Sequence, residues 1–401
     1  AGTMRVTWLE LEEFRCFRSL SLDIPPAGFR LFGKNGSGKT SLIEALYLLA
    51  TTRSFRTTTE RYLIHRESAR EFGLQPYARI AARLTSPEGH RTAEIVLRLD
   101  PSTLTITKRY RRDGRPVRAM DFVGTVRVVL FSPEDIELVT GSPSLRRRYL
   151  DVTLSTIDAT YLRALAQYAR ILEHRNSLLK QLAGKDRRTI DDELAFWDEQ
   201  LVTFGSYLIV ARYRFLTEWG KSVSERFREL STGNQLLTTR YSCSLSIPAI
   251  VEAELTERPL PDAQATLSPL YREALEQLRT DEIRRGSTLL GPHRDDLVWL
   301  LDNESLVALG SRGLQRLAVL AGKLAEITTI QHATGDWPIL LLDDVLSELD
   351  SRHRARLCTT LAAFPAQQII TAADRAALEQ PEFAALPLAV LDDTQRTLTF
   401  V

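Results

Sequence analysis

Apolar residues in the first quarter of the chain follow two different periods. Between residues 6 and 95 they form short runs of strand length, except in segment 40–50, where they recur at helical spacing. The helical positions are Leu42, Ile43, Leu46 and Leu49. The pattern predicts an α/β arrangement in which one amphipathic helix packs against strands.

Alternating apolar and polar residues follow this segment and predict a β-hairpin. Runs at 94–99 and 104–110 precede Asp113-Gly114, and a further run starts at Pro116. An Asp-Gly pair between alternating runs is a strong signal for a tight turn. We therefore expect the N-terminal part to end in strands.

The middle of the chain is predicted to be helical. From 144 to about 230 the apolar spacing is helical, with a break at 184–186 between amphipathic stretches at 161–182 and 193–227. Segment 259–269 contains prolines and is interpreted as a connector, a helix follows to about 284, and α/β character returns at Gly286. We expect a discontinuous lobe I at 4–130 and 286–401, with a helical lobe II inserted at 131–285. Heptads are too few for a long coiled coil.

Composition adds limits to this picture. The chain has 401 residues, 44% of them hydrophobic, so it can bury a substantial core. Its three cysteines are Cys16, Cys243 and Cys358; their spacing favours neither a disulfide framework nor a zinc site. No membrane-length apolar stretch or signal-peptide pattern occurs, so we expect a cytoplasmic protein. The net charge is only +1, so any binding to nucleic acid would depend on local basic patches.

A phosphate-binding motif lies between an apolar run at 29–32 and the helix at 40–50. Its residues, which match GxxxxGK[ST], are Gly33, Lys34, Asn35, Gly36, Ser37, Gly38, Lys39 and Thr40. Such a loop turns backbone N–H groups toward phosphates, its lysine meets the β- and γ-phosphates, and its hydroxyl ligates Mg²⁺. The strand and helix on either side make a plain glycine-rich turn a remote alternative. The motif predicts binding of ATP and Mg²⁺ as cofactors.

A second carboxylate for the metal follows the apolar run 339–342. The continuous run is typical of a buried parallel strand, and it ends in Asp343 and Asp344. We expect Asp343 to contact Mg²⁺ through its water shell and Asp344 to be the catalytic group that polarises the attacking water. The alternative for Asp344 is a strand-end cap.

Segment 310–316 predicts a second helix whose N-terminus could bind phosphate. Ser311 precedes a helix with Leu317, Leu320, Leu324 and Ile327 on one face, and it could hold a γ-phosphate or serve only as an N-cap. With 347–350 directly after the carboxylate pair, the arrangement resembles the signature and D-loop of ABC ATPases. That resemblance implies an ATP-dependent homodimer, in which the serine of one subunit caps the ATP held by the other.

Within that class the sequence resembles the RecF family. The segments that carry the resemblance are 132–135, 141–151, 286–288, 291–296 and 341–357, and it extends from residue 9 to 371. It implies an ABC-type ATPase head like those of the SMC and break-repair proteins, but with a short helical lobe. It also implies a recombination mediator that recognises gapped DNA and works with RecR and RecO to load RecA.

Two departures from related ATPases bear on turnover. Segment 132–135 replaces the usual glutamine loop, so the metal-sensing role could pass to Glu134 or Asp135. Thr371 stands where ABC transporters carry a switch histidine. The absence of that histidine disfavours a transporter subunit, and slow hydrolysis is expected.

Basic residues crowd around the predicted hairpin turn. They are Lys108, Arg109, Arg111, Arg112 and Arg115, with Arg118 nearby and Tyr110 interleaved. The cluster favours DNA phosphate binding and a solvated hairpin equally. For 146–148 we expect a structural or nucleotide-linked role, and for 293–296 an ion-paired loop in preference to a metal site.

Together these features lead to a hypothesis in which ATP joins two heads, the closed dimer presents a basic surface to DNA, and hydrolysis opens it again. The alternatives are another ABC-class ATPase that does not act on DNA and a nucleotide-stabilised scaffold without productive hydrolysis.

Overall fold

The computed structural model describes residues 2–69, 74–309 and 311–401, and the chain separates into two compact units. Unit 1 comprises Ala1–Asp135, Arg226–Asn234 and Val319–Val401; unit 2 comprises Ile136–Glu225 and Gln235–Ala318. Unit 1 therefore combines both ends of the chain with a short segment from its middle. The outer boundaries of unit 2 lie at 135 and 318, whereas the sequence placed the lobe boundaries at 130 and 285.

Unit 1 contains an antiparallel sheet built from the N-terminal third of the chain. Alternation of apolar and polar residues gives this sheet one buried face and one polar face. Its strands, in spatial order, are β3 (Phe17–Asp23), β2 (Arg5–Phe14), β5 (Tyr77–Ser86), β6 (Gly89–Leu99), β7 (Ile106–Arg112) and β8 (Arg115–Val117). The predicted hairpin is confirmed: β7 pairs with β8 across Asp113 and Gly114, both with positive φ.

The second sheet of unit 1 brings together strands from both ends of the chain. Its strands are, in order, β17 (Leu398–Phe400), β16 (Leu388–Leu391), β4 (Gly28–Phe32), β15 (Gln368–Ala372), β14 (Ile339–Asp343) and β9 (Val128–Phe131). All pairs are parallel except β16 with β17. Strand β14 is buried along its whole length, as its continuous apolar run predicts, and β15 is equally buried.

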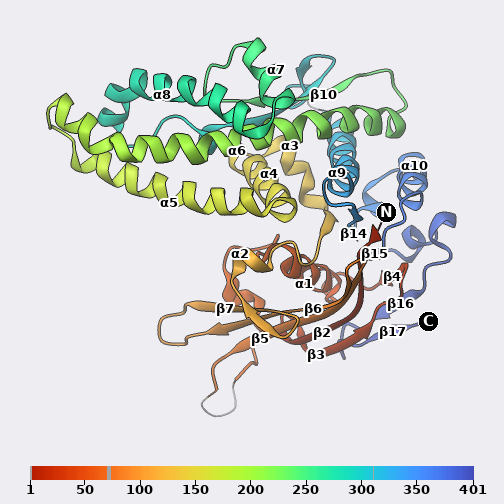
Figure 1. The fold of residues 1–401 in the computed structure, drawn as a ribbon. Helices are drawn as coiled ribbons and strands as arrows, with labels where there is room; N and C mark the ends of the chain where they lie inside the picture. The colour runs from red at the N-terminus through yellow and green to blue at the C-terminus, as the bar shows by residue number, and fades with distance from the viewer. Residues whose placement is uncertain (1, 70–73, 310) are drawn as a thin grey trace. The chain divides into compact units, whose positions relative to one another are not determined.

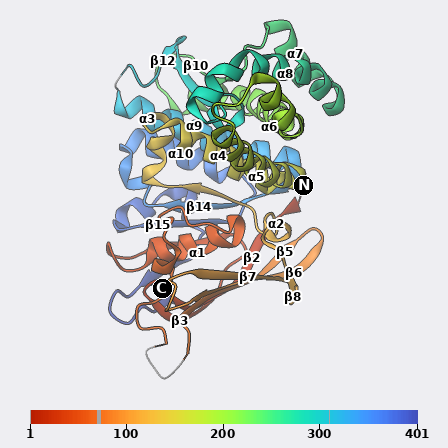
Figure 2. The same ribbon diagram turned by 90° about the vertical axis from the view of Figure 1, so that its left-hand side faces the viewer.

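Helix α1 (Lys39–Thr51) lies between these two sheets, as Figure 2 shows. Its apolar residues share one core with Leu9 and Leu11 of β2 and with Leu341 of β14. Because most of its residues are buried, the position of its N-terminus is fixed by packing on both sides. The remaining elements of unit 1 are β1 (Gly2–Thr3), η1 (Glu60–Leu63), α2 (Ala119–Phe122), β13 (Asp336–Trp337), η4 (Leu346–Glu348), α10 (Ser351–Ala362), η5 (Arg375–Leu378) and η6 (Pro381–Phe383).

Unit 2 is mostly helical, and in Figure 1 its long helices α5, α6 and α8 run alongside one another. Apolar side chains of these three helices form a common cluster. The helices are α3 (Glu137–Thr140), α4 (Pro143–Ile157), α5 (Ala159–Gln181), α6 (Arg187–Leu230), α7 (Ala249–Glu257) and α8 (Leu260–Arg285), with η3 (Pro292–Arg294). A small sheet adds β10 (Leu237–Ser242), β11 (Asp296–Leu301) and β12 (Glu304–Ser305).

Among the described residues, three helical elements cross the boundaries between the units. Helix α6 ends inside unit 1, α9 (Arg312–Thr334) begins in unit 2 and continues into unit 1, and η2 (Pro133–Ile136) ends in unit 2. The sheet partly explains why unit 2 extends past residue 285. Strand β11 pairs with β10 along its whole length, so residues 296–301 pack with the helical unit.

The predicted connector at 259–269 is wrong, because this segment forms the first part of α8. Pro261 lies in the first turn, where a missing N–H costs no hydrogen bond. Pro269 is tolerated inside the helix, where Leu267 and Tyr271 beside it are fully buried. Tertiary packing thus outweighs a local helix-breaking signal.

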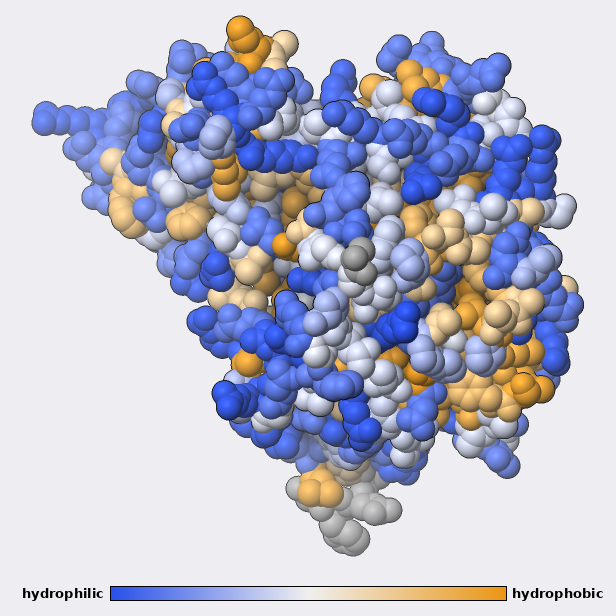
Figure 3. Space-filling model, turned by 45° about the vertical axis from the view of Figure 1, so that its right-hand side comes forward, coloured by the Kyte–Doolittle hydropathy of each residue, from blue (hydrophilic) through white to orange (hydrophobic). Residues whose placement is uncertain are grey.

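No helix among the described residues combines the length and apolar character needed to span a membrane. The face drawn in Figure 3 is largely hydrophilic, with apolar side chains in separate patches.

Candidate functional site

The P-loop (residues 33–40) joins β4 to α1 in unit 1. Gly38 has a φ of 114°, and a Cβ added there would lie 2.8 Å from both Cys16 Sγ and Phe17 Cζ. Gly36 also has a positive φ, of 82°. Glycine at these positions lets the loop turn tightly into the helix without steric cost. The segment therefore has the conformation that brings the first N–H groups of α1 together at one place.

Ser37 supplies an unsatisfied polar group inside this loop. Its side chain is fully buried, and its Oγ has no hydrogen-bond partner among the described residues. A buried hydroxyl without a partner costs free energy unless a ligand or water completes it. The loop is thus polar on its inner side and incomplete without a bound group.

Four predicted site residues meet at the end of β14. Thr40 Oγ1 donates to Asp343 Oδ2 at 3.0 Å, and Lys39 Nζ lies 3.4 Å from Asp344 Oδ1. Lys39 is almost completely buried, so its ammonium group depends on nearby oxygens. The structure therefore brings Lys39, Thr40, Asp343 and Asp344 together, although they lie about 300 positions apart.

The two carboxylates have different surroundings. Asp343 is buried, and its Oδ1 accepts a hydrogen bond from Thr371 Oγ1 at 2.8 Å. Burial raises the pKa of Asp343, and the negative charge of Asp344 raises it further, against the hydrogen bonds from Thr371 and Thr40. Asp344 faces the cavity with a left-handed φ of 55°, and its Oδ1 accepts from the Ala373 N–H at 3.0 Å. Asp343 is thus fixed by two hydroxyl groups in a buried position, whereas Asp344 remains accessible from the cavity.

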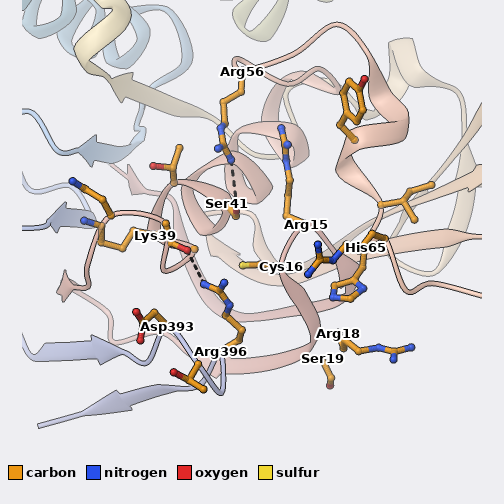
Figure 4. Close-up of a pocket in the computed structure, with 18 of the residues that line it drawn as sticks. Arg15, Cys16, Arg18, Ser19, Lys39, Ser41, Arg56, His65, Asp393 and Arg396 are labelled. Carbon is orange, nitrogen blue, oxygen red and sulfur yellow. Dashed lines mark hydrogen bonds between the residues drawn. The ribbon is translucent and has the colours of Figure 1, made fainter.

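A cavity of about 1120 Å³ opens beside the P-loop, and all of its lining residues belong to unit 1. Figure 4 shows many of them, including Lys39, Arg15 and Arg396. Its charged lining residues are Arg15, Arg18, Arg56, Arg61, Arg66, Arg396 and Lys39, with Asp344 and Asp393 as the carboxylates. Because the cations outnumber the carboxylates, the cavity favours an anionic ligand.

A buried glutamate on α1 orders two of these arginines. Glu44 is fully buried and accepts from Arg15 Nε at 2.8 Å and from Arg15 Nη2 at 2.9 Å. Arg56 donates to Ser41 Oγ at 3.3 Å and lies 3.5 Å from Glu44 Oε1, and Ser54 Oγ also donates to Glu44. The two-point Arg15 pair fixes this side chain at the cavity wall. Sequence analysis missed this cluster, because nothing in the local pattern links 15, 44 and 56.

Arg396, from the turn between β16 and β17, also lines the cavity. Its Nη1 donates to the carbonyl oxygens of Gly36 at 2.7 Å and of Ser37 at 2.6 Å. The sequence offered no signal for this contact, since the two segments lie about 360 positions apart.

The predicted signature serine lies in unit 2, at the start of α9. Ser311 is exposed, and its Oγ accepts a long hydrogen bond, 3.4 Å, from the Leu314 N–H. Gly310, the first residue of the predicted motif, lies outside the described residues. The hydroxyl is therefore weakly engaged and accessible at a helix N-terminus.

The replacement for the glutamine loop is tied into its own turn. Asp135 Oδ2 accepts from the Ser132 N–H at 2.8 Å, and Lys323 Nζ lies 4.0 Å from Asp135 Oδ1. Burial raises the pKa of Asp135 to about 6, although Lys323 opposes this shift. Neither Glu134 nor Asp135 lines the cavity.

The basic residues of the predicted hairpin divide between two faces. Lys108 Nζ donates to Thr52 O at 3.0 Å and lies 2.9 Å from Glu60 Oε2, and Arg112 donates to Asp121 O. By alternation along the strand, Arg109 and Arg111 lie on the opposite, exposed face, and Arg115 is exposed in β8. Two of the five predicted residues thus point inward, and three remain accessible.

Residues 293–296 make contacts within unit 2. His293 Nδ1 lies 2.7 Å from Tyr168 Oη, Asp295 accepts from the Ser244 N–H at 2.7 Å, and Asp296 pairs with Arg146 at 2.7 Å. Desolvation lowers the pKa of His293 to about 4, so its ring is neutral at pH 7. No cluster of three or more potential metal-ligating side chains occurs in the part of the chain that the structure describes.

Comparisons with known proteins agree with this geometry. The family model described as the RecF/RecN/SMC N terminal domain matches residues 5–391. The chain is 61% identical over 390 residues to the DNA replication and repair protein RecF of Thermomicrobium roseum, across 97% of this chain and 98% of that protein. It is 43% identical over 381 residues to RecF of Herpetosiphon aurantiacus, across 92% and 94% of the two chains.

Solved structures show the same likeness. A structure of the recombination mediator protein RecF-ATP in the RecFOR pathway matches with a TM-score of 0.83 and 27% identity, over 100% of this chain and 98% of that one. The Smc head domain of Pyrococcus furiosus matches with a TM-score of 0.53 and 16% identity, over 100% and 96% of the two chains, and shares the fold. The expected ABC-type head is therefore confirmed.

Proposed function

The chain belongs to the RecF family of DNA replication and repair proteins, and we propose that it is a Mg²⁺-dependent ATPase whose nucleotide state controls dimerisation and DNA binding. One observation carries the proposal. A cationic cavity is built on a P-loop, where the buried Lys39 and the Thr40–Asp343 pair meet. This set of donors and acceptors fits a metal-bound nucleoside triphosphate.

The residues present fit each part of such a ligand. Thr40 and Asp343 supply the hydroxyl and carboxylate oxygens that Mg²⁺ prefers, and Lys39 with the N–H groups of the P-loop supplies donors for phosphate oxygens. The buried Ser37 hydroxyl provides a further donor that has no hydrogen-bond partner in the described part of the chain. Bound Mg²⁺ would neutralise charge on the phosphate oxygens.

Asp344 is the proposed catalytic group for hydrolysis. It lines the cavity directly after the metal-binding Asp343, and its Oδ1 is oriented by the Ala373 N–H and Lys39. A carboxylate there can accept a proton from an attacking water. Its left-handed backbone is a strained conformation of a kind that often marks a functional site.

Replacing Asp344 by asparagine is expected to lower the rate of phosphate release about 100-fold, because the amide keeps the shape but cannot accept the proton. Affinity for ATP should stay within about three-fold of wild type, since Lys39 and the P-loop are intact. Phosphate release under single-turnover conditions and equilibrium binding measure the two effects. Asp393→Asn is a matched control, because Asp393 lines the same cavity but is not placed in the catalytic set.

An unchanged rate in Asp344→Asn would remove the catalytic role of Asp344. If wild type itself binds ATP but releases no phosphate, with or without DNA, the chain acts as a nucleotide-stabilised scaffold. If it hydrolyses ATP but binds no DNA, it is another kind of ABC-class ATPase. The same assays thus separate the proposed function from both alternatives.

Dimerisation is proposed from the accessible signature serine. Ser311 is exposed at the start of α9, and Val307 and Leu309 in the preceding loop expose about half of their side-chain surface. A weakly engaged hydroxyl with exposed apolar residues beside it is suited to a partner surface. We propose that Ser311 of one subunit caps the γ-phosphate of ATP bound to the other.

DNA is the proposed macromolecular ligand, at the boundary between duplex and single strand. The relatives are DNA replication and repair proteins, and the matching RecF-ATP structure is described as part of the RecFOR pathway. We therefore propose RecR, together with RecO, as protein partners and loading of RecA as the outcome. Hydrolysis is proposed to be slow and stimulated by DNA.

The exposed arginines of the β7–β8 hairpin are the proposed DNA contacts. Replacing both Arg109 and Arg111 by alanine should weaken binding to gapped duplex about ten-fold and lower the slope of log affinity against log salt by about 2. The reason is that two phosphate contacts are lost. Binding across a salt series, with ATP and Mg²⁺ present, measures both quantities.

Lys108→Ala is the matched control on the same strand. Its ammonium is tied to Thr52 and Glu60, so the variant should lose about 1 kcal/mol of stability yet keep its DNA affinity and salt slope. Equal losses of DNA affinity in both variants would contradict the proposal that DNA binds the exposed face of the hairpin. No loss in the double variant would place the DNA surface elsewhere.

A further inference from the structure

The C-terminal hairpin of unit 1 holds the P-loop from outside. In the turn between β16 and β17, the half-buried Arg396 uses one nitrogen to donate to the Gly36 and Ser37 carbonyls, at 2.7 and 2.6 Å. Figure 4 shows this side chain reaching toward the loop. Both acceptors are main-chain atoms of the P-loop. The contact therefore fixes the orientation of the P-loop backbone and does not involve the side chains of the loop.

A second turn in the same unit shows that the hairpin itself does not require this arginine. In the loop between β6 and β7, Asp100 N–H donates to Thr105 O and Leu104 N–H to Asp100 O, at 2.9 and 2.8 Å. In the loop after β16, Asp392 N–H donates to Thr397 O and Arg396 N–H to Asp392 O, at 2.9 and 3.0 Å. The two loops therefore have the same length and the same closing bonds.

The fifth residue of each loop has a left-handed backbone, with a φ of 56° at Leu104 and 55° at Arg396. Glycine adopts this conformation at the lowest cost, and a long side chain gains nothing from it. Leu104 is exposed and absent from the cavity lining, whereas Arg396 reaches the P-loop. The side chain of Arg396 is thus explained by its contact and not by its turn.

The C-terminal hairpin is held in place by its contacts with strand β4. β16 pairs in parallel with β4, the strand that leads directly into the P-loop. Phe400 of β17 packs edge-on against Phe29 of β4, with 5.6 Å between the ring centroids. The P-loop is consequently held at two places. Strand pairing holds β4, which precedes it, and Arg396 holds Gly36 and Ser37 within it. A guanidinium beside the loop also adds positive charge at the cavity rim.

We propose that Arg396 is a positioning residue that holds the P-loop in its phosphate-binding form, so that the C-terminal hairpin takes part in nucleotide affinity. The proposal rests on the proposed nucleotide function of the cavity. The hydrogen bonds that the Arg396 side chain makes with described residues go to carbonyl oxygens of the P-loop, so its loss should raise the KM for ATP and leave kcat nearly unchanged.

The test compares Arg396→Gly, Arg396→Lys and Leu104→Gly in the full chain, using ATP with Mg²⁺. Arg396→Gly should raise KM and the equilibrium Kd about ten-fold, because two charge-assisted hydrogen bonds are lost, while kcat stays within about two-fold. Arg396→Lys should be intermediate, since it keeps the charge but its ammonium nitrogen lies one bond nearer to Cα than Nη1 does and reaches less far. Leu104→Gly relaxes an equivalent backbone and should bind ATP as wild type does.

Thermal midpoints without nucleotide complete the experiment. Both glycine variants should melt close to wild type, because relief of the left-handed conformation offsets their other losses. If wild type and Leu104→Gly bind ATP and a folded Arg396→Gly binds equally well, the proposal is overturned. If Arg396→Gly does not fold, Arg396→Lys decides, and wild-type affinity in that variant overturns the proposal. If wild type fails to bind ATP, the proposed function itself has failed.

Discussion

Lys39→Ala is expected to lower the affinity for ATP at least about 100-fold and to abolish every ATP-dependent property of the protein. Lys39 is buried at the N-terminus of α1, and its Nζ is held near Asp344 Oδ1 at the end of β14. A charged donor in such a dry position contributes strongly to phosphate binding, and a 100-fold change corresponds to about 2.7 kcal/mol. Titration calorimetry with ATP and Mg²⁺ measures the loss directly.

Lys34→Ala provides the control from the same loop. The side chain of Lys34 is exposed and does not line the cavity, so its removal deletes the same charge but leaves the backbone N–H groups of the P-loop in place. We expect affinity within about three-fold of wild type for this variant. A folded Lys39→Ala protein that binds ATP as well as Lys34→Ala would contradict the assignment of the cavity as the nucleotide site.

Ser311→Arg is expected to abolish ATP-dependent dimerisation without affecting ATP binding by the monomer. The exposed serine lies in unit 2, whereas the lining residues of the cavity beside the P-loop lie in unit 1, so the change leaves the P-loop intact. An arginine would occupy the space in which a second subunit has to present its γ-phosphate. Molar mass from light scattering, with and without ATP and Mg²⁺, reports the effect.

Ser177→Arg controls for the added bulk and charge. Ser177 is an exposed position on α5 of the same unit, where arginine is a good helix former. This variant should dimerise with ATP as wild type does. An ATP-induced dimer that persists in Ser311→Arg would exclude a signature loop acting across the dimer.

The chemistry of the site could be predicted from sequence wherever it depends on short segments. The P-loop lies between a strand and an amphipathic helix, and the run 339–342 has the continuous apolar character of a buried parallel strand. Each pattern is local, and because a P-loop needs a second carboxylate for its metal, Lys39 and Asp343 were expected to belong to one site. The Asp113-Gly114 turn was predictable for the same reason.

Residues joined by distant strand pairing could not be predicted. Arg396 reaches Gly36 because β16 pairs with β4. The apolar pattern of residues 392–397 does not predict that pairing. The inward direction of Lys108 also depends on partners outside its strand, Thr52 and Glu60. Only the first part of helix α8, 260–269, was misread as a connector, because burial of its apolar face outweighs the helix-breaking tendency of Pro269.

The central claim is that ATP converts separate heads into a DNA-binding dimer. Its most direct test is the molar mass in solution with ATP and Mg²⁺, with ADP and without nucleotide, followed by binding of the same samples to gapped duplex. The account predicts a monomer that becomes a dimer only with ATP and then binds DNA more tightly, in a salt-dependent way. An unchanged mass, with the same DNA affinity in all three states, would contradict it.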